Sequence, residues 1–245
     1  MSTSDQSYIR QDTFDTSLSI WKSTEVCDLY KSNNLVYKRA KSDISRSSFL
    51  SERNALRDLS SIEGVIKYVD SFEDNGSLFL VMEYFDGQQI KMCNLSDNET
   101  VLIMLNIIAT IIDIHDKGYC HFDLTPNNII LNKVSKDFRV IDFGSSVPSK
   151  TGKYDVTSFS TFTPPNMNNP SEIDAYALGV TLYYAVNGMF PFIAYGGMKG
   201  KLYPDPSTNG NDLINLVIDG LINPDARFRM SLEDAAEILL KHRSS

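Results

Sequence analysis

The segment that decides the fold reads HFDLTPNNIILNKVSKDFRVIDFG and covers residues 121–144. A short apolar run at 129–131 and, after a turn, the residues at 139–141 predict a hairpin. Asp123 and Asn128 lie in the loop before this hairpin, and Asp142 follows its second strand. One carboxylate can orient a hydroxyl group, while a carboxylate and an amide hold Mg²⁺ against phosphates. The segment therefore suits phosphoryl transfer.

The composition is ordinary for a globular protein, with 42% hydrophobic and 22% charged residues. A chain of 245 residues is long enough for one large domain or two closely packed lobes. The net charge of −8 argues against nucleic acid as a main partner, because binding phosphates needs an excess of Lys and Arg. The same charge disfavours anionic membrane surfaces.

The cysteines and the apolar stretches predict a cytoplasmic protein. The three cysteines are far apart and have no ligand-like spacing, which is typical of thiols in a reducing compartment: Cys27, Cys93 and Cys120. The first residues contain no apolar stretch, so no secretory signal is expected. The most apolar run, 101–114, is too short to span a bilayer and contains two polar residues. Delivery into another cell stays open.

The first third of the chain predicts a small lobe dominated by strands. Residues 1–17 are rich in Ser, Thr and Asp and read as a flexible N-terminal arm. Alternating patterns predict five strands, at 18–22, 25–30, 35–39, 65–72 and 78–84. One helix, at 43–60, falls between the third and the fourth strand. We therefore expect a mostly antiparallel α+β lobe over 18–86.

The remainder, 87–245, predicts a helical lobe. Ser96 and Glu99 form a capping box that begins a helix, which ends near Gly118. Apolar residues nearly encircle this helix, so we expect it in the core. The Ser-, Thr- and Pro-rich stretch 145–170 reads as a functional loop, and further helices are predicted at 173–187, 213–221 and 232–242. A crevice between the two lobes is the expected ligand site.

These motifs resemble those of the eukaryotic-type protein kinases over about 18–242. Residues 121–128 are similar to the family's catalytic loop, and Asp142-Phe143-Gly144 is similar to its metal-binding motif. The segments that resemble the phosphate lysine, the hinge and two C-lobe anchors are VYK at 36–38, LVMEYFDG at 80–87, DAYALGVTL at 174–182 and NPDARFR at 223–229. The resemblance implies a bilobal α+β fold.

The resemblance also implies a role for each matching residue at the centre of the site. Asp123 would accept or orient the substrate hydroxyl, and Asn128 and Asp142 would hold Mg²⁺. Lys38 would contact the α- and β-phosphates of ATP if Glu52, on the following helix, holds it in place. Lone residues of these types are mostly solvated surface groups, and only their joint occurrence in this order favours the catalytic interpretation.

The remaining implied site residues surround the nucleotide. Thr125 stands beside the position of the γ-phosphate, where the Ser/Thr kinases usually have Lys. The adenine is expected to meet five residues, among them the gatekeeper and two that offer backbone groups: Val26, Val36, Met82, Glu83 and Phe85.

The function implied by the resemblance is transfer of the γ-phosphoryl group of ATP, with Mg²⁺, to Ser or Thr hydroxyls of a protein substrate. A regulatory protein partner is a further expectation. Two alternatives stay open. One is a catalytically impaired pseudokinase that serves as a binding or scaffold module, and the other is a kinase-like enzyme that phosphorylates a small molecule.

The sequence departs from the family pattern around the phosphates. The three positions of the glycine-rich loop fall on Ser19, Trp21 and Thr24, so we expect a weaker grip on the triphosphate. Phe122 replaces the Arg that grips a phosphorylated activation loop, which argues against that switch. Asn166 replaces the family's Glu, so the structural Arg229 either loses its partner or pairs with Glu172. His121 and Asp174 are expected to brace the backbone.

Overall fold

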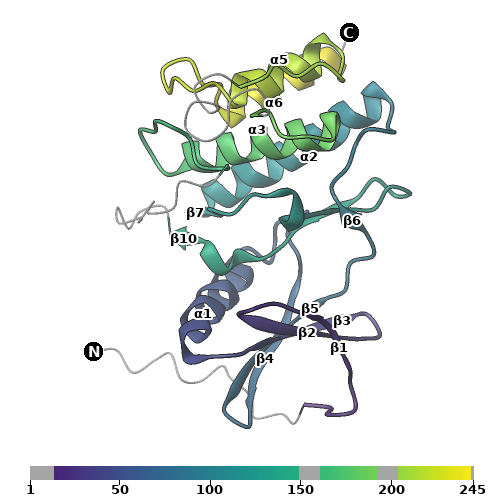
Figure 1. The fold of residues 1–245 in the computed structure, drawn as a ribbon, viewed down its shortest axis with the longest axis vertical. Helices are drawn as coiled ribbons and strands as arrows, with labels where there is room; N and C mark the ends of the chain where they lie inside the picture. Colours follow the sequence, from purple (N-terminus) through teal and green to yellow (C-terminus); the bar gives the residue numbers. More distant parts are fainter. Residues whose placement is uncertain (1–13, 149–160, 193–203, 244–245) are drawn as a thin grey trace.

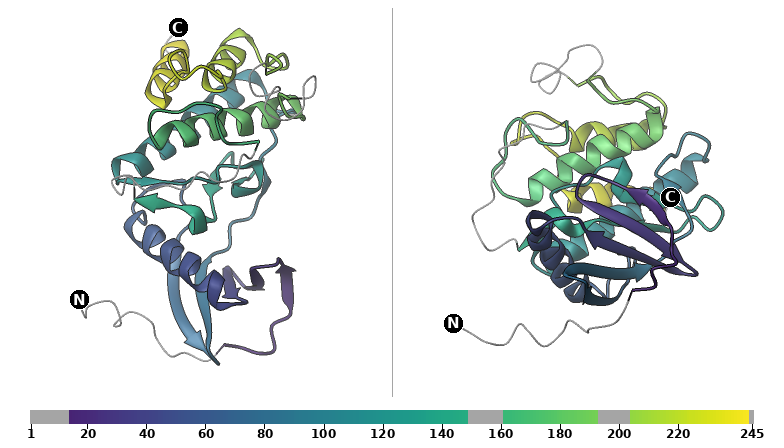
Figure 2. Two further views of the ribbon diagram at one scale, coloured as in Figure 1. Left: turned by 60° about the vertical axis from the view of Figure 1, so that its left-hand side comes forward. Right: turned by 60° about the horizontal axis from the view of Figure 1, so that its bottom comes forward.

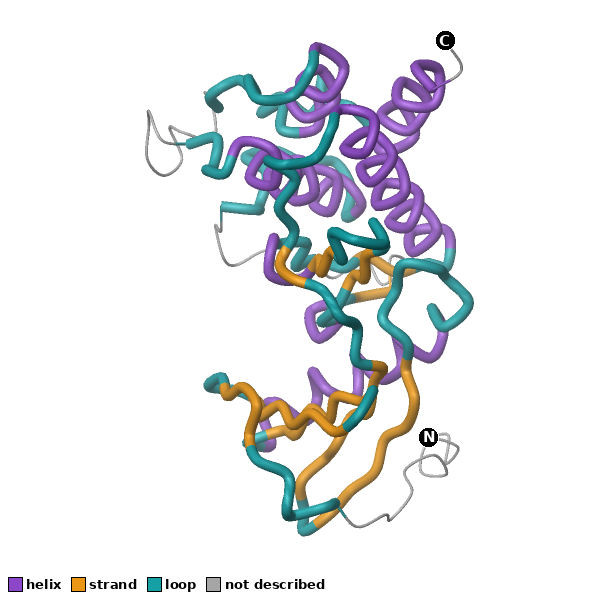
Figure 3. The backbone as a smooth tube through the Cα atoms, turned by 90° about the vertical axis from the view of Figure 1, so that its right-hand side faces the viewer, coloured by secondary structure: helices purple, strands orange, loops and turns teal. Residues whose placement is uncertain are grey.

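A computed structural model describes residues 14–148, 161–192 and 204–243, and these residues form two lobes (Figure 1). Figure 3 shows most strands gathered in one lobe and most helices in the other. The predicted bilobal α+β architecture is therefore present. The two lobes share one continuous apolar core, which includes residues of α1, α2 and α3.

The N-terminal lobe is built on a five-stranded sheet in the order β1-β2-β3-β5-β4, and every pair of neighbouring strands is antiparallel. Its strands are β1 (Ile20–Ser23), β2 (Cys27–Ser32), β3 (Leu35–Ala40), β4 (Tyr68–Asp74) and β5 (Ser77–Glu83). Helix α1 (Asp43–Asp58) follows β3 and packs against β3, β4 and β5. All five predicted strands and the helix are present, with their ends at or within three residues of the predicted positions.

The two faces of this sheet carry different side chains because strand residues alternate between faces. One face, which we call the inner face, contributes Lys38 to the crevice and its apolar side chains to the shared core. The outer face holds a separate aromatic cluster around Tyr30 and Phe79. The ring of Phe14 stacks on that of Phe79, with 4.6 Å between the centroids. It also meets the ring of Tyr30 edge-on, with 4.8 Å between the centroids. The predicted arm therefore packs on the sheet from Phe14 onwards, and its residues 1–13 lie outside the described part of the chain.

The C-terminal lobe is organised around helix α2 (Asp97–Asp116). The predicted capping box is present, since Ser96 and Glu99 satisfy each other's backbone N–H groups, and Gly118 adopts a positive φ of 84° after the helix. By length and composition α2 could cross a membrane, yet ten of its side chains are buried in the protein core. We therefore interpret α2 as the predicted core helix.

Three further helices complete this lobe: α3 (Ser171–Asn187), α5 (Asp212–Leu221) and α6 (Leu232–Arg243). Helix α6 packs against α2, and α5 packs against α3. The left view in Figure 2 shows these helices at the opposite end of the molecule from the β-sheet. The three predicted helices therefore appear at their predicted places.

The segment 121–144 forms the predicted hairpin where the lobes meet. Its strands are β8 (Ile129–Leu131) and β9 (Phe138–Val140), which pair with each other, and β8 also pairs with β6 (Gln88–Gln89). The 3₁₀ turns η1 (Pro126–Asn128) and η2 (Phe143–Ser145) flank it. A second small sheet joins β7 (Tyr119–Cys120) to β10 (Val147–Pro148).

Gly64 allows the connection between α1 and β4 to lie directly against the C-terminal lobe. Its carbonyl accepts a hydrogen bond from Val140 N at 2.7 Å, and Val65 bridges Val140. Gly64 has a φ of 86°, and a Cβ atom at this position would lie 2.6 Å from Oγ1 of Thr110. Only glycine accepts both this backbone conformation and this approach. The junction fixes the hairpin relative to the N-terminal lobe.

Candidate active site

Lys38 is held between two carboxylates that come from different elements. Its Nζ lies 2.7 Å from Oε2 of Glu52, on α1, and 2.9 Å from Oδ1 of Asp142, just after β9. Lys38 is 8% exposed and Glu52 only 1%. Strand pairing places Lys38 opposite Leu29 and Leu80, whose side chains belong to the inner face. The predicted Lys38–Glu52 ion pair is therefore present.

This arrangement keeps the Lys38 ammonium and the Asp142 carboxylate charged. Burial alone would lower the pKa of Lys38, but the negative charges of Glu52 and Asp142 outweigh it and raise that pKa well above its ordinary value. Burial likewise acts to raise the pKa of Asp142, yet the positive charge of Lys38 prevails and leaves it lowered. Asp142 is thus ionised at neutral pH and can serve as a cation ligand.

Asp123 and Asn128 are brought together by the loop that precedes β8. The amide Nδ2 of Asn128 donates to the backbone carbonyl and to Oδ2 of Asp123, both at 2.8 Å. Thr125 N also donates to the Asp123 carbonyl, at 2.9 Å, and Pro126 then begins η1. Because its amide nitrogen is used in this way, Asn128 presents its other amide atom, Oδ1, as the one that can coordinate a cation.

The carboxyl group of Asp123 has a raised pKa. Burial is the largest cause, and the charge of Asp142 adds to it, while His121 and the hydrogen bond from Asn128 act in the opposite direction. A carboxylate that binds a proton more readily than usual is a better proton acceptor near neutral pH. Asp142 and Asp123, although both near the crevice, therefore have environments that move their pKa values apart.

Asp174, on α3, holds the catalytic-loop backbone in place. Its fully buried carboxylate accepts hydrogen bonds from His121 N at 2.7 Å and Phe122 N at 2.8 Å, and Nε2 of His115 lies 2.9 Å away. His121 is also buried, and its ring contacts the Ile141 carbonyl and Phe143. Both residues therefore brace the site, as predicted.

Two residues of the site adopt the left-handed backbone conformation that side chains disfavour. Phe122 has a φ of 64° and Asp142 a φ of 63°. Conformations of this kind cost about 1–3 kcal/mol each and persist where the surroundings impose them. Here the hydrogen bond to Asp174 fixes Phe122, and the ion pair with Lys38 fixes Asp142. In this backbone conformation the Asp142 carboxylate lies 2.9 Å from Nζ of Lys38.

The chemistry of these donors fits Mg²⁺ and a nucleoside triphosphate. Asp142 offers an ionised carboxylate and Asn128 an amide oxygen, which are hard oxygen ligands of the kind Mg²⁺ binds. Lys38 offers a buried, permanently charged ammonium beside them. These residues would hold the cation and the phosphates, and Asp123 is near enough to Asp142 for the charge of Asp142 to raise its pKa. Their assignment as ligands stays a prediction.

The residues expected around the adenine lie where β5 ends. Met82 is buried on the inner face, and Val36 pairs with it across β3 and β5. Glu83 is the last residue of β5, and its carboxylate accepts a hydrogen bond from Nε of Arg139 at 2.8 Å. Phe85 follows, with the Arg139 guanidinium 4.7 Å from its ring centroid. Their roles toward a nucleotide stay predictions.

Val26 is less well placed than Leu29, three residues further along the chain, to contact an adenine from the inner face. Val26 lies in the bend before β2 and is 57% exposed, so nothing packs it against the inner face. Leu29 pairs with Lys38 and packs on the shared core. A sequence signal for Leu29 exists, because side chains alternate between the two faces of a strand. Asp28 and Tyr30 are buried on the outer face, so Leu29 between them lies on the inner face. The sequence prediction missed Leu29 because the pairing of β2 with β3, which no local pattern reveals, decides which residue lies opposite Lys38.

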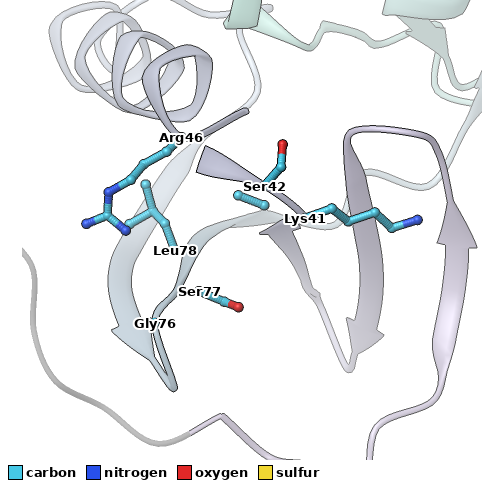
Figure 4. A pocket seen from close by; sticks show the side chains of 7 residues that line it. Lys41, Ser42, Arg46, Gly76, Ser77 and Leu78 are labelled. Carbon is cyan, nitrogen blue, oxygen red and sulfur yellow. The ribbon is translucent and has the colours of Figure 1, made fainter. Parts of the chain in front are cut away.

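A tight turn replaces that loop between β1 and β2. Thr24 N donates to the Cys27 carbonyl, and Cys27 N donates to the Thr24 hydroxyl, so the turn uses its own backbone amides. Lys41 fixes the turn from the end of β3, with Nζ 2.7 Å from Oγ of Ser23 and 3.1 Å from the buried Asp28. Figure 4 shows the Lys41 side chain extending toward these strands, away from Arg46. These amides are not available to phosphates.

Arg229 keeps a carboxylate partner despite the altered motif at 164–166. Its side chain is 2% exposed and lies 3.4 Å from Oε2 of Glu172, the substitute considered from the sequence. It also donates to the carbonyls of Asn223 and Pro224. Residues 149–160 of the predicted loop lie outside the described residues, so the expectation drawn from Phe122 stays a hypothesis. Thr125 lies at the start of η1, and its hydroxyl does not cap that turn.

A second polar cluster, not predicted from the sequence as a unit, lies behind the loop. Atoms of His115, Cys120 and Asp174 approach within 4.8 Å of one another, in the arrangement of a possible metal site. Burial, aided by the charge of Asp174, raises the pKa of the Cys120 thiol to about 12, which keeps it protonated. The carboxylate is already used by three N–H groups. We interpret this cluster as structural.

Comparison with known proteins agrees with this geometry. The family model described as "Protein kinase domain" matches residues 28–240. Myosin light chain kinase family member 4 of Homo sapiens is 31% identical over 142 residues, which cover 53% of this chain and 37% of that protein. Calcium-dependent protein kinase 20 of Oryza sativa subsp. japonica is 24% identical over 238 residues, which cover 87% and 42%.

Serine/threonine-protein kinase dkf-1 of Caenorhabditis elegans is 26% identical over 187 residues, which cover 67% of this chain and 26% of that protein. The chain thus spans less than half the length of these relatives. The match of the family model covers most of the chain, including Lys38, the Asp123 loop and Asp142. With a buried lysine held between two carboxylates and a hydrogen-bonded Asp–Asn pair in the loop before β8, the chain belongs to the protein kinase family.

Proposed function

We propose that this protein transfers the γ-phosphoryl group of ATP to a Ser or Thr hydroxyl of a protein substrate, in a reaction that requires Mg²⁺. The observation that carries the proposal is the position of the Lys38 ammonium, 2.7 Å from Glu52 and 2.9 Å from Asp142. A buried lysine with two carboxylates is costly to keep unless the site uses its charge. The Ser/Thr preference is supported by the name of the dkf-1 relative.

In the proposed reaction, the Asp123 carboxylate accepts the proton of the substrate hydroxyl as the oxygen attacks the γ-phosphorus. One O–P bond forms, the bond from that phosphorus to the β–γ bridging oxygen breaks, and ADP leaves with the bonding electrons. When bound, Mg²⁺ neutralises charge on the β- and γ-phosphates. Lys38 orients the phosphates, while Asn128 keeps the Asp123 carboxylate in position through its Nδ2 group.

The proposal is tested by incubating the purified protein with Mg-ATP and a mixture of protein substrates. Mass spectrometry then identifies the phosphorylated residues. We expect phosphoserine and phosphothreonine, which Asp123→Asn and Asp142→Asn should abolish. Asp137→Asn is the matched control, because Asp137 lies in the turn of the same hairpin, away from the site. Phosphotyrosine alone would contradict the Ser/Thr assignment.

One observation favours a second candidate, a pseudokinase that binds partners without turnover. The turn at Thr24 and Cys27 uses its amides internally, which removes donors that a kinase places over the phosphates. This candidate predicts nucleotide or partner binding without phosphate transfer in the same experiment. Phosphate found only on an added metabolite would instead identify a small-molecule kinase. A regulatory protein partner stays a prediction.

A further inference from the structure

Trp21 lies on the inner face of the sheet, the face that also carries Lys38. The pairing of β1 with β2 shifts between Ile20, which lies opposite Tyr30, and Lys22, which lies opposite Leu29. A bulge of this kind places two residues opposite one. Because Tyr30 faces the outer cluster and Leu29 the inner core, Trp21 and Lys22 share the side of Leu29.

The indole of Trp21 reaches the segment that joins the lobes. Its ring centroid lies 6.1 Å from that of Tyr84 at an interplanar angle of 75°. Tyr84 directly follows β5, and two strands, β2 and β3, separate β5 from β1 in the sheet. The contact between Trp21 and Tyr84 therefore spans the inner faces of β2 and β3. Tyr84 N donates to the Asn34 carbonyl at 2.6 Å, which ties this end of the segment to the turn between β2 and β3.

Lys31 completes the cluster from β2. Its Nζ lies 3.3 Å from the centroid of the Tyr84 ring, a close cation–π contact. Lys31 pairs with Val36, which in turn pairs with Met82. Because Val36 and Met82 are expected to contact the adenine, Lys31 borders the predicted adenine position. We call Trp21, Lys31 and Tyr84 the aromatic rim.

We propose that Trp21 is a positioning residue for the nucleoside, and that the aromatic rim covers the base and ribose from the side where the glycine-rich loop is missing. This inference rests on the proposed function, because it assigns the base position to the hinge. A purine ring offers a π-face to the indole, and stacking of this kind tolerates small changes in geometry. The side chain of Trp21 is 53% exposed, which leaves its surface accessible to a ligand.

The proposal predicts an unusual balance of affinities. The backbone amides of Thr24 and Cys27 donate within their own turn. The turn between β1 and β2 therefore offers few hydrogen-bond donors to phosphates. The aromatic rim instead contributes contacts to the nucleoside. Adenosine should therefore retain most of the affinity of ATP, and inorganic tripolyphosphate should bind weakly.

Trp21 is the single tryptophan of the chain, so its fluorescence can be excited selectively and reports on this site. The full chain is titrated with Mg-ATP, adenosine, Mg-CTP and tripolyphosphate, and calorimetry measures the same affinities independently. We expect ATP and adenosine to change the emission of Trp21, with a smaller change for CTP because a pyrimidine has less stacking surface. Tripolyphosphate should leave the emission unchanged.

Two variants test the role of the side chain. Trp21→Ala should weaken adenosine and ATP binding about tenfold, whereas Trp21→Phe should lose about threefold or less. Ile20→Ala is the matched control, because Ile20 is the preceding residue, is 52% exposed and faces the other side of the sheet. It should bind both ligands like the wild type. Thermal unfolding checks that each variant is folded.

The outcomes separate the two claims. If calorimetry detects ATP but the fluorescence stays constant and Trp21→Ala binds ATP normally, the role of Trp21 is wrong while the proposed function stands. If adenosine binds far more weakly than ATP, the predicted balance is wrong. If the wild type binds no nucleotide, both the proposed kinase activity and the role of Trp21 are overturned.

Discussion

The ammonium group of Lys38 lies 2.7 Å from Oε2 of Glu52, although only fourteen positions separate the two residues along the chain. The short separation is possible because α1 begins at Asp43, almost directly after β3 ends at Ala40. Glu52 then falls on the helix face that meets β3 and η2. The ion pair therefore survives a shortened connection.

This pair predicts that Glu52→Gln lowers kcat/KM about 10²-fold. The uncharged amide no longer fixes Lys38, and a misplacement of about 1 Å in a phosphate-binding group costs a factor of this size. Initial rates at varied ATP concentration measure the loss. Glu63→Gln is a suitable control, because Glu63 is exposed outside the site. An unchanged rate in Glu52→Gln would show that Asp142 alone positions the lysine.

Asp123 predicts an acid limb in the pH–rate profile. Burial raises the pKa of its carboxyl group, so the proton-accepting form is lost at a higher pH than the ordinary Asp value of about 3.9. We expect log kcat/KM to fall with unit slope below that raised pKa. The lowered pKa of Asp142 keeps this ligand ionised over the same range. A profile that stays flat down to pH of about 4 would contradict the assignment.

The same carboxyl group predicts a pH-dependent effect on stability. A folded-state pKa above the unfolded value means that the folded state retains its proton to higher pH, so the stability of the wild type falls as pH rises through this window. Asp123→Asn cannot ionise and should raise the free energy of unfolding at neutral pH. The difference in unfolding free energy between Asp123→Asn and the wild type should vanish below pH of about 3.9. There the Asp123 carboxyl group is protonated in both the folded and the unfolded wild type. Urea unfolding at both pH values measures it, and equal stability at neutral pH would refute it.

Asn128 predicts a change in metal dependence. Asn128→Ala should raise the Mg²⁺ concentration needed for half-maximal activity by about tenfold or more, because an oxygen ligand is lost. Asn128→Asp restores the oxygen but removes the Nδ2 donor that holds Asp123, so the metal dependence should recover while kcat stays low. Asn127→Ala, at the exposed neighbour, should leave both unchanged. A normal metal dependence in Asn128→Ala would exclude it as a ligand.

Glu172 predicts an effect on stability alone. It accepts hydrogen bonds from Arg229 and from Asn168 and Asn169. Glu172→Gln should lower the free energy of unfolding by about 1–3 kcal/mol, because the buried guanidinium loses its charged partner. Guanidinium chloride unfolding measures the loss, and Glu233→Gln, at an exposed acid on α6, is the control. A drop in activity without a drop in stability would indicate a role beyond the fold.

Local sequence patterns predicted the positions of the helices well. The ends and register of the first strands depend on tertiary pairing, which local patterns do not reveal. The capping box of Ser96 and Glu99 lies within four residues, so the sequence identifies the start of α2 directly. The ends of β1 and β2 depend on pairing and on the bulge at Trp21, which no local pattern reveals. The sequence therefore suggested Val26 as a residue near the adenine, whereas the register places Leu29, and not Val26, opposite Lys38.

The candidate site was predictable only through the order of its motifs. Lys38 and Asp142 are 104 positions apart, so nothing in their spacing places them 2.9 Å from each other. The three hydrogen-bonding contacts of Asp174 likewise span more than fifty positions, and only the bracing role was expected. The use of backbone amides within the turn at Thr24 was unpredictable, because it depends on a side-chain hydroxyl folding back on its own turn.

Helix α2 has a consequence for how the protein is made. It is synthesised long before α6, which packs along it in the finished fold. Until α6 leaves the ribosome, the side of this twenty-residue apolar helix that α6 covers stays exposed. Exposed apolar surface of this kind is where nascent chains aggregate or bind chaperones. A nonsense mutation that removes α6 would therefore yield an insoluble or rapidly degraded product, even though every residue of the candidate site would still be translated.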